Sequence, residues 1–152
     1  MQEIDPTDHR ILAELQRDCD QSLERLSEKI HLSRNACWRR IKTLEKSGVI
    51  KKRVAILDPA KLGLGLEVFI QVRTSSHDSG WLTEFARATR ALPEILGAYR
   101  MTGDLDYLIR ARVRDVADYD RLYQRLIDRV ALSDVSASFV MEEIKDSTEL
   151  PL

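Results

Sequence analysis

The spacing of apolar residues changes near residue 60, and this change most constrains how the chain can fold. Up to residue 50 the apolar residues recur every three or four positions, as on one face of a helix. From residue 66 onward, segments of strict alternation appear, as in half-buried strands. Asp58-Pro59 and the glycines at 63 and 65 mark a break between the two patterns. A chain of 152 residues has room for two small domains, so we predict one over residues 1–60 and another over 61–152.

The first domain is predicted to hold three short helices. Asp5, Ser22 and Ser33 are residue types that cap helix N-termini, and each precedes a run with helical spacing. The third helix should stop at Gly48, a residue type favoured just after helix C-termini. A tight turn between the second and third helices indicates a helix-turn-helix. Residues 49–57 are rich in β-formers around a basic centre, which predicts a small wing or a linking strand.

The second domain is predicted to alternate strands and helices in the order βαββαβ, a ferredoxin-like arrangement, so the fold class is α+β. Both helices of such a fold cover one sheet face, and the other face would carry Phe69 and Val140 among polar residues. Exposed apolar groups there predict association through that face. The expected strands are residues 66–73, 95–101, 107–113 and 135–144, with helices containing residues 81–86 and beginning after Asp115.

The distribution of charge is more informative than the net charge of −1. Residues 33–53 hold eight lysines and arginines against a single acid, Glu45, which gives this stretch a net charge of +7. A local basic stripe on a slightly acidic chain is typical of a surface that binds phosphates. Nucleic acid is therefore the predicted partner of the third helix.

On a helical wheel the third helix has two distinct faces. Cys37, Ile41 and Leu44 fall together and would pack on the other helices, while the opposite face is basic. In a helix-turn-helix this helix enters the major groove, where Arg39 suits guanine and Asn35 suits adenine. Cations beside and after the helix are better placed for phosphates. The candidate DNA-binding residues are Ser33, Arg34, Asn35, Trp38, Arg39, Arg40, Lys42, Lys51, Lys52 and Arg53.

The sequence contains few residues for metal or catalytic chemistry. Cys19 and Cys37 cannot form a metal site alone, and His9, His31 and His77 lack metal-ligand spacing. No nucleophile–base pair or phosphate loop is recognisable, so we predict no cofactor, no metal and no catalysis. No apolar run approaches the roughly 18 residues of a membrane helix, and the N-terminus is unlike a signal peptide. We therefore expect a cytoplasmic protein with no membrane partner.

Two long motifs resemble the Lrp/AsnC family of feast/famine transcription regulators. The N-terminal motif runs through DHRILAELQRD and LSEKIHLSRNACWRRIKTLEKSGVIKKR, and the C-terminal one through PEILGAYRMTGDLDYLIR and SASFVMEEIKDSTELPL. The resemblance covers nearly the whole chain. Within the family it is strongest to a cysteine-responsive subgroup that has a Cys-Trp pair in the third helix and a cysteine after the first. This subgroup points to cysteine or another small amino acid as the effector.

The resemblance implies a regulator of amino-acid metabolism that binds double-stranded DNA and is associated with the bacterial nucleoid. It also implies a homodimer joined through RAM-type C-terminal sheets, assembling further to an octamer, with an effector pocket between dimers. Gly103 lets backbone N–H groups approach a carboxylate, and a nearby aspartate can pair with an α-ammonium group. The family's Pro-Gly turn before the last strand is absent, because residues 130–133 read Val-Ala-Leu-Ser. The effector-binding positions that the motif match carries over are Met101, Thr102, Gly103, Asp104, Asp106, Ser136 and Ser138.

Two other functions fit the same fold. A sirohaem-decarboxylase-like enzyme would need basic and histidine side chains gathered around a tetrapyrrole, whereas the three histidines here are scattered. An amino-acid-binding module without DNA function would have no need of the basic stripe on the third helix. Steep salt dependence of DNA binding would favour a regulator over both alternatives.

Overall fold

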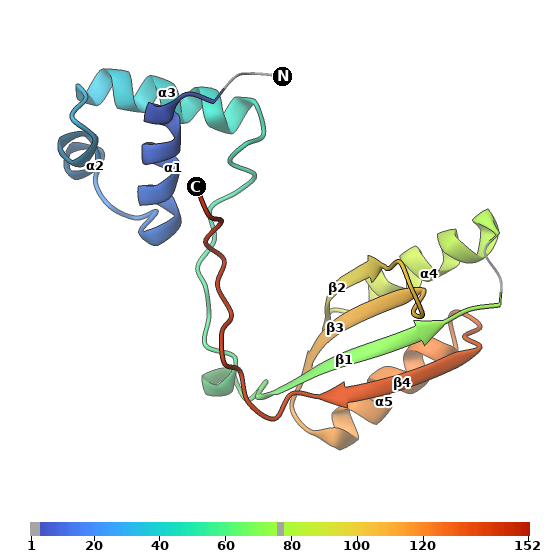
Figure 1. Ribbon diagram of the computed structural model, residues 1–152. Helices are drawn as coiled ribbons and strands as arrows, with labels where there is room; N and C mark the ends of the chain where they lie inside the picture. Colours follow the sequence, from blue (N-terminus) through green and yellow to red (C-terminus); the bar gives the residue numbers. More distant parts are fainter. Residues whose placement is uncertain (1–3, 76–77) are drawn as a thin grey trace. The chain divides into compact units, whose positions relative to one another are not determined.

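The computed structural model describes residues 4–75 and 78–152 (Figure 1). The chain forms two compact units. The helical unit runs up to Ile56 and also includes Lys145–Leu152, and the sheet unit spans Leu57–Ile144. The division into domains at residue 60 stays a prediction. Within the described ranges, no helix is long and apolar enough to cross a membrane.

The described part of the helical unit contains three helices: α1 (Pro6–Arg17), α2 (Leu23–Ile30) and α3 (Arg34–Lys46). The predicted caps are confirmed, because the side chains of Asp5, Ser22 and Ser33 each accept a backbone N–H from the first turn of their helix. Isolated helices of this length are marginal in water, so burial of apolar side chains between them supplies the stability. The shared core consists of Ile11, Leu26, Ile30, Cys37, Ile41 and Leu44.

The ends of the helices depend on two residues in left-handed conformation. His31 has a φ of 56° and ends α2, with its N–H bonded back to the Glu28 carbonyl. Gly48 has a φ of 78° and follows the end of α3, as predicted. Of the small wing or linking strand predicted over residues 49–57, the linking strand is wrong, because residues 51–58 contain neither helix nor strand. The described part of the helical unit offers this segment no strand with which to share backbone hydrogen bonds.

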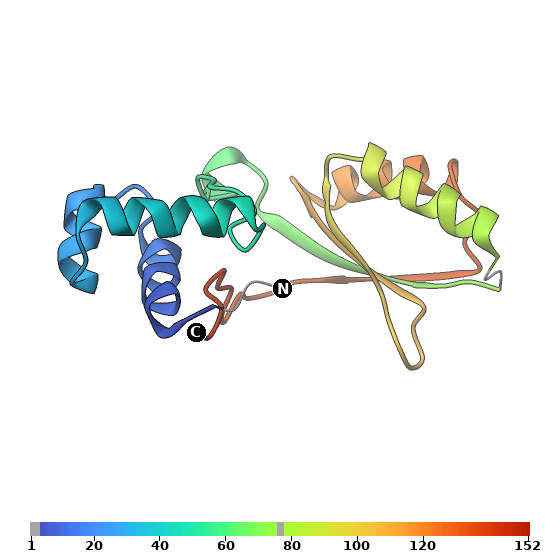
Figure 2. The ribbon, with the colours of Figure 1, turned by 90° about the horizontal axis from the view of Figure 1, so that it is seen from above.

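Over its described residues, the sheet unit contains four antiparallel strands in the order β2-β3-β1-β4, with both helices on one face (Figure 2). The predicted βαββαβ order and the α+β class are confirmed. The prediction overran two strand ends, since β2 ends before Met101 and β4 ends at Phe139. After a short 3-10 turn at Ala60–Leu62, the elements are β1 (Leu66–Arg73), α4 (Ser79–Ala91), β2 (Ile95–Arg100), β3 (Tyr107–Val113), α5 (Val116–Ile127) and β4 (Asp134–Phe139).

Alternation along β1 separates the two faces of the sheet. Val68 and Ile70 are fully buried beneath the helices, in a core that includes residues of β3, α4 and α5. The residues between them point to the opposite face, where Phe69 pairs with Ser138 of β4. The face that the helices leave open therefore mixes apolar and polar groups, as the alternation predicted.

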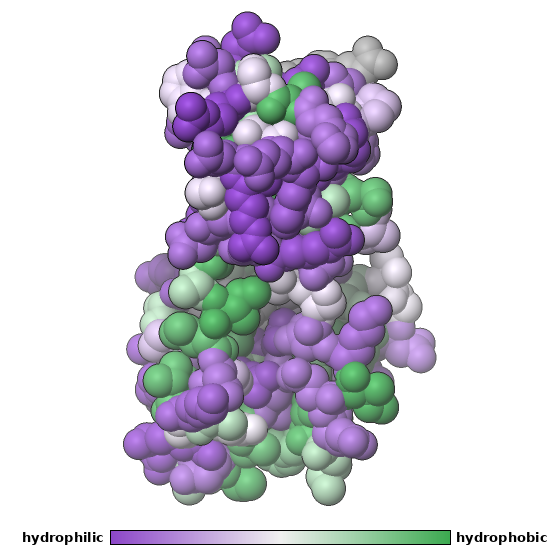
Figure 3. All heavy atoms as spheres, turned by 90° about the vertical axis from the view of Figure 1, so that its left-hand side faces the viewer, coloured by the Kyte–Doolittle hydropathy of each residue, from purple (hydrophilic) through white to green (hydrophobic). Residues whose placement is uncertain are grey.

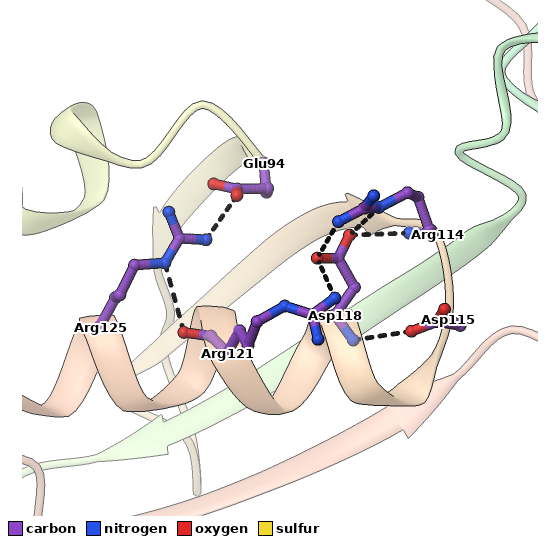
Figure 4. Close-up of polar contacts among 6 residues, drawn as sticks. All are labelled: Glu94, Arg114, Asp115, Asp118, Arg121 and Arg125. Carbon is purple, nitrogen blue, oxygen red and sulfur yellow. Dashed lines mark hydrogen bonds and ion pairs between the residues drawn. The ribbon is translucent and has the colours of Figure 1, made fainter.

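A polar network stabilises the start of α5 (Figure 4). The Asp118 carboxylate accepts hydrogen bonds from the Arg114 backbone and guanidinium at 3.1 to 3.2 Å, and from Arg121 Nη2 at 2.9 Å. The Asp118 N–H in turn donates to Oδ1 of Asp115, which caps the helix. The Arg114 guanidinium, more than any other group, holds the pKa of Asp118 well below its usual range.

Asp118→Asn is expected to destabilise the sheet unit at neutral pH and to weaken its response to acid. A carboxyl group whose pKa is lowered by folding stabilises the fold above its unfolded pKa of about 3.9, and that stabilisation is lost as the pH falls below this value. The wild-type chain should therefore lose this contribution on acidification, whereas the variant has none to lose. Urea unfolding at about pH 7 and about pH 3 measures both effects. Asp120→Asn on the same helix is the control, and equal acid sensitivity of all three chains would contradict the assignment.

Candidate nucleic-acid interface and effector site

α3 presents its polar residues outward and its apolar residues to the core, as the helical wheel predicted. Cys37, Ile41 and Leu44 are buried against α1 and α2. The predicted DNA-binding residues other than Arg40 are exposed, including Trp38, which exposes 54% of its surface. Hydrophilic side chains cover most of the visible surface of the helical unit, the upper part of Figure 3. A packed three-helix core thus holds a basic helix face open to solvent.

The polar residues on this face differ in how far they are already bonded within the protein. In the part of the chain that the structure describes, the side chains of Asn35 and Arg39 make no hydrogen bond or ion pair. Lys42 Nζ and Arg53 Nη2 lie 2.7 Å and 3.0 Å from the two carboxylate oxygens of Glu45, and Lys42 foremost lowers the pKa of that acid. Arg39 and Asn35 are therefore available for base edges, whereas Lys42 and Arg53 would exchange Glu45 for phosphate oxygens.

Arg40 lies apart from the other predicted DNA-binding residues. Its Nη1 donates to Asp5 Oδ2 at 2.7 Å and to Asp8 Oδ1 at 2.9 Å, which ties α3 to the start of α1. The Asp8 side chain is only 7% exposed, so Arg40 neutralises a carboxylate removed from water. Hydrogen bonds from the Asp8 backbone N–H and from Arg40 also lower the pKa of Asp5. The phosphate contact of Arg40 stays a prediction. Its guanidinium is already bonded to Asp5 and Asp8 within the protein.

The two cysteines differ in exposure. Cys19 is exposed after α1, while Cys37 lies in the helical core, where burial raises the pKa of its thiol. A raised pKa keeps the thiol protonated and unreactive near neutral pH. Among the described residues, no group of three His, Cys, Asp or Glu side chains is placed to hold a metal ion, and His77 lies outside those residues.

The predicted effector residues fall into two groups on different strands. Met101, Thr102, Gly103 and Asp104 form the exposed turn between β2 and β3, in which Gly103 has a φ of 102°. Ser136 and Ser138 lie on β4, on the open sheet face. In the strand order β1 separates β4 from β3, so about 10 Å of sheet lies between the two groups. A single chain therefore does not bring the serines against the turn.

The end of β1 holds Asp106 in place. Its Oδ2 accepts the backbone N–H of Thr74 at 2.8 Å, and its own N–H donates to the Val72 carbonyl at 3.2 Å. Asp106 thereby anchors the β2–β3 turn to the neighbouring strand. The Asp104 carboxylate, by contrast, makes no hydrogen bond or ion pair with any residue that the structure describes. The motif match offers Asp104 or Asp106 as the partner of an α-ammonium group, and Asp104 is the one whose charge is available.

Sequence reasoning missed a group of polar side chains beside this turn. Arg73 Nε donates to the Asp104 carbonyl at 3.0 Å, and its Nη1 lies 2.7 Å from Asp134 Oδ2. Ser133 Oγ accepts the backbone N–H of Ser75 at 2.9 Å. Arg73 and Asp134 are paired in direct register, so alternation along β1 and β4 contained the signal that places them on one face. They add a cation and an anion to the end of the sheet where the turn lies.

Among the described residues, two cavities lie along α4, and neither is lined by a predicted effector residue. One, of about 380 Å³, lies between α4 and β2 and includes Phe85, Ile95 and Tyr107. The other, of about 410 Å³, is lined by residues near the C-terminal ends of α4 and α5. The predicted effector residues thus lie outside both cavities, and all of them except the half-buried Asp106 are exposed in the single chain.

Both halves of the chain match known protein families. Residues 67–150 match the Lrp/AsnC ligand binding domain, and residues 4–51 match a winged helix-turn-helix DNA-binding domain. These two matches agree with the basic helix of the helical unit and with the βαββαβ order of the sheet unit.

Three relatives illustrate the similarity. The chain is 49% identical over 152 residues to the glutamate uptake regulatory protein of Zymomonas mobilis, covering 100% of this chain and 93% of that one. It is 45% identical over 150 residues to the DNA-binding transcriptional activator DecR of Escherichia coli, with coverage of 98% and 99%. A transcriptional regulator of Neisseria meningitidis, solved as a complex with L-methionine, has a TM-score of 0.93 and 35% identity, with coverage of 98% and 97%. Their names confirm the prediction of a regulator over an enzyme, and the chain belongs to the Lrp/AsnC family of transcription regulators.

Proposed function

We propose that this regulator of amino-acid metabolism reads DNA through the outward face of α3 and responds to a small amino acid bound by its sheet unit. The observation that carries the DNA-binding half is the Arg39 side chain, which is exposed and unpaired among the described residues. The opposite face of the same helix is packed in a core. Because that core fixes α3, the base-reading groups are positioned before DNA arrives.

The chemistry of each exposed residue suggests its contact on a duplex. Arg39 presents a planar fork that matches N7 and O6 of guanine, and Asn35 matches N6 and N7 of adenine. Ser33 Oγ accepts the Ala36 N–H at 3.3 Å and caps α3, and the other N–H groups at the start of the helix are proposed to face a phosphate. Trp38 flanks the base-reading pair. The residues proposed to neutralise phosphates and set the register are Arg34, Lys42, Lys51, Lys52 and Arg53.

The salt dependence of affinity tests the DNA-binding half. Binding of the full chain to mixed genomic DNA is measured between about 50 and 200 mM salt. Because bound phosphates release their counterions, the logarithm of the association constant should fall linearly and steeply with the logarithm of salt concentration. Binding that is weak and insensitive to salt would overturn the proposal.

The chemistry of the β2–β3 turn and the L-methionine bound to the Neisseria relative support the effector half. Gly103 lets backbone N–H groups approach a carboxylate, and Asp104 offers an available charge to an α-ammonium group. Since a single chain keeps the β4 serines away from its turn, we place the effector between copies of the chain. In this arrangement two chains associate through their open sheet faces to form a homodimer, and dimers assemble into an octamer. Cysteine and methionine are the first amino acids to test.

The effector acts by a shift of population. An amino acid that binds one assembly better than another favours that assembly, and thereby changes the spacing of the α3 helices presented to DNA. Regulation of this kind needs no catalytic step. Action on chromosomal DNA places the regulator in the bacterial cytoplasm, at the nucleoid.

Asp104→Asn is expected to weaken amino-acid binding about tenfold while leaving effector-free DNA binding unchanged. The amide keeps the size of the side chain and removes the negative charge that pairs with the ammonium group. A thermal-shift screen of amino acids first identifies the effector, since a ligand that prefers the folded assembly raises its Tm. Calorimetry then compares wild type, Asp104→Asn and the control Asp120→Asn. Equal affinities in all three chains would place the ammonium partner elsewhere.

A further inference from the structure

The C-terminal segment, Lys145–Leu152, belongs to the helical unit although it follows the last strand of the sheet unit. The chain end lies beside α1 in both ribbon views (Figures 1 and 2). Leu150 N–H donates to Gln16 Oε1 at 2.6 Å, and Gln16 Nε2 donates to the Leu150 carbonyl at 3.2 Å. Next to this contact, Arg17 Nε lies 3.9 Å from Glu149 Oε2. The end of α1 thus holds a segment that the family match counts with the ligand-binding domain.

The Gln16 contact resembles strand pairing. The Gln16 side-chain amide bonds both the N–H and the C=O of Leu150. The N–H and C=O of one residue point to the same side only in extended backbone. Pro151 favours that conformation, because the residue before a proline is restricted to the extended region. The Arg17–Glu149 pair is exposed and contributes little. Gln16 therefore makes the paired hydrogen bonds that hold Leu150 at the end of α1.

This docking changes how the helical unit is connected. The chain leaves the helical unit after Ile56 and returns to it at Lys145, so two covalent passages join the units. The first passage includes residues 51–58, which contain neither helix nor strand. A unit held by one irregular segment can take many orientations, and fixing it at a DNA site then costs conformational entropy. A second passage that is anchored on α1 reduces the number of orientations before binding.

We propose that the end of α1, through Gln16, is a docking surface for the chain's own C-terminal segment, and that the docked segment presents α3 to paired DNA half-sites. This inference rests on the proposed function, in which two α3 helices of a dimer bind half-sites at a set spacing. Docking favours simultaneous contact with both half-sites, because it limits where the second α3 can lie once the first is bound. It adds nothing to the contact of one α3 with one half-site, since Gln16 lies on α1 and not on the DNA-reading face.

Gln16→Ala removes both hydrogen bonds to Leu150 and keeps a residue that favours helix, so α1 itself should fold normally. Amide hydrogen exchange at Leu150, measured by NMR on the full chain, should become faster by at least about fivefold. An operator is selected from random-sequence DNA, and a second DNA has one of its half-sites scrambled. Affinity for the complete operator should fall about five- to tenfold, while affinity for the single half-site should stay unchanged.

Gln124→Ala on α5 is the matched control, because it removes the same side chain from an exposed position of the sheet unit. Unchanged exchange at Leu150 in Gln16→Ala would overturn the docking role of Gln16. Faster exchange with unchanged affinity for the complete operator would overturn the link to half-site presentation, as would an equal loss on both DNAs. If the wild-type chain binds neither DNA, the proposed function fails, and the link between docking and half-site presentation fails with it. The rate of amide exchange at Leu150 still tests whether Gln16 docks the C-terminal segment.

Discussion

Alanine in place of Arg39 is expected to weaken binding to the cognate DNA site by about 1–3 kcal/mol, which corresponds to a loss of affinity of roughly fivefold to 150-fold. The guanidinium is exposed on the outward face of α3 and is unpaired among the residues that the structure describes. No contact with a described residue therefore has to be broken before the Arg39 guanidinium binds a guanine. Two parallel hydrogen bonds to one base carry sequence information, so the loss should fall on the cognate site more than on unrelated DNA.

Competition binding at one fixed salt concentration, with cognate and scrambled DNA, measures this difference. Arg39→Lys keeps the charge and loses the planar fork, so it should recover phosphate-type affinity without recovering sequence choice. Arg10→Ala removes an exposed arginine from α1 and is the matched control. A loss of equal size on both DNAs would make Arg39 a phosphate contact. An unchanged affinity for the cognate site would remove it from the interface.

Local patterns account for the parts of the fold that the sequence predicted well. Ser22 and Ser33 cap their helices because a side-chain oxygen satisfies a backbone N–H that the helix itself leaves unpaired. Alternation along β1 predicted its buried face, because successive side chains of a strand point to opposite faces. Each of these signals lies within a few residues of the element that it describes.

The contacts that the sequence did not reveal join segments that are far apart in the chain. Strand β4 ends at Phe139, which pairs with Val68 of β1, and the last backbone bond between the two segments runs from Val140 to Glu67. The alternation of residues 135–144 gives no hint of where this pairing with β1 stops. The sequence likewise contains no measure of the distance between the β2–β3 turn and the two serines, Ser136 and Ser138, which the strand order separates by β1.

Arg40 shows the same limit within the candidate DNA-binding surface. The basic run in α3 predicted a cation for DNA at this position as readily as at Arg39. Asp5 and Asp8, which bind the Arg40 guanidinium, lie more than thirty residues earlier in the chain. Neighbouring arginines of one helix thus have different environments, and only the packing of α1 against α3 distinguishes them.

Arg40→Ala is accordingly expected to destabilise the helical unit by about 1–3 kcal/mol. Its main effect is therefore on folding, whereas the main effect of Arg39→Ala is on DNA binding. The substitution removes two charge-assisted hydrogen bonds between α3 and α1. It also leaves the Asp8 carboxylate, whose side chain is 7% exposed, without its guanidinium partner. Arg40→Lys restores the charge with a shorter reach and fewer donors, so it should recover part of the loss.

Chemical unfolding of the full chain, followed by backbone signals from α1 to α3, measures the change in the free energy of unfolding. The loss should shrink in acid, because the pKa of Asp5 is lowered by folding and its pairing with Arg40 disappears once the pH falls well below 3.8, the ordinary value for this group. The double variant Arg40→Ala with Asp8→Asn should be more stable than Arg40→Ala alone, since it no longer buries an unpaired charge. A different result would make Arg40 a DNA contact that pairs with Asp5 and Asp8 only in the absence of DNA. In that case Arg40→Ala would keep normal stability and lose affinity for DNA.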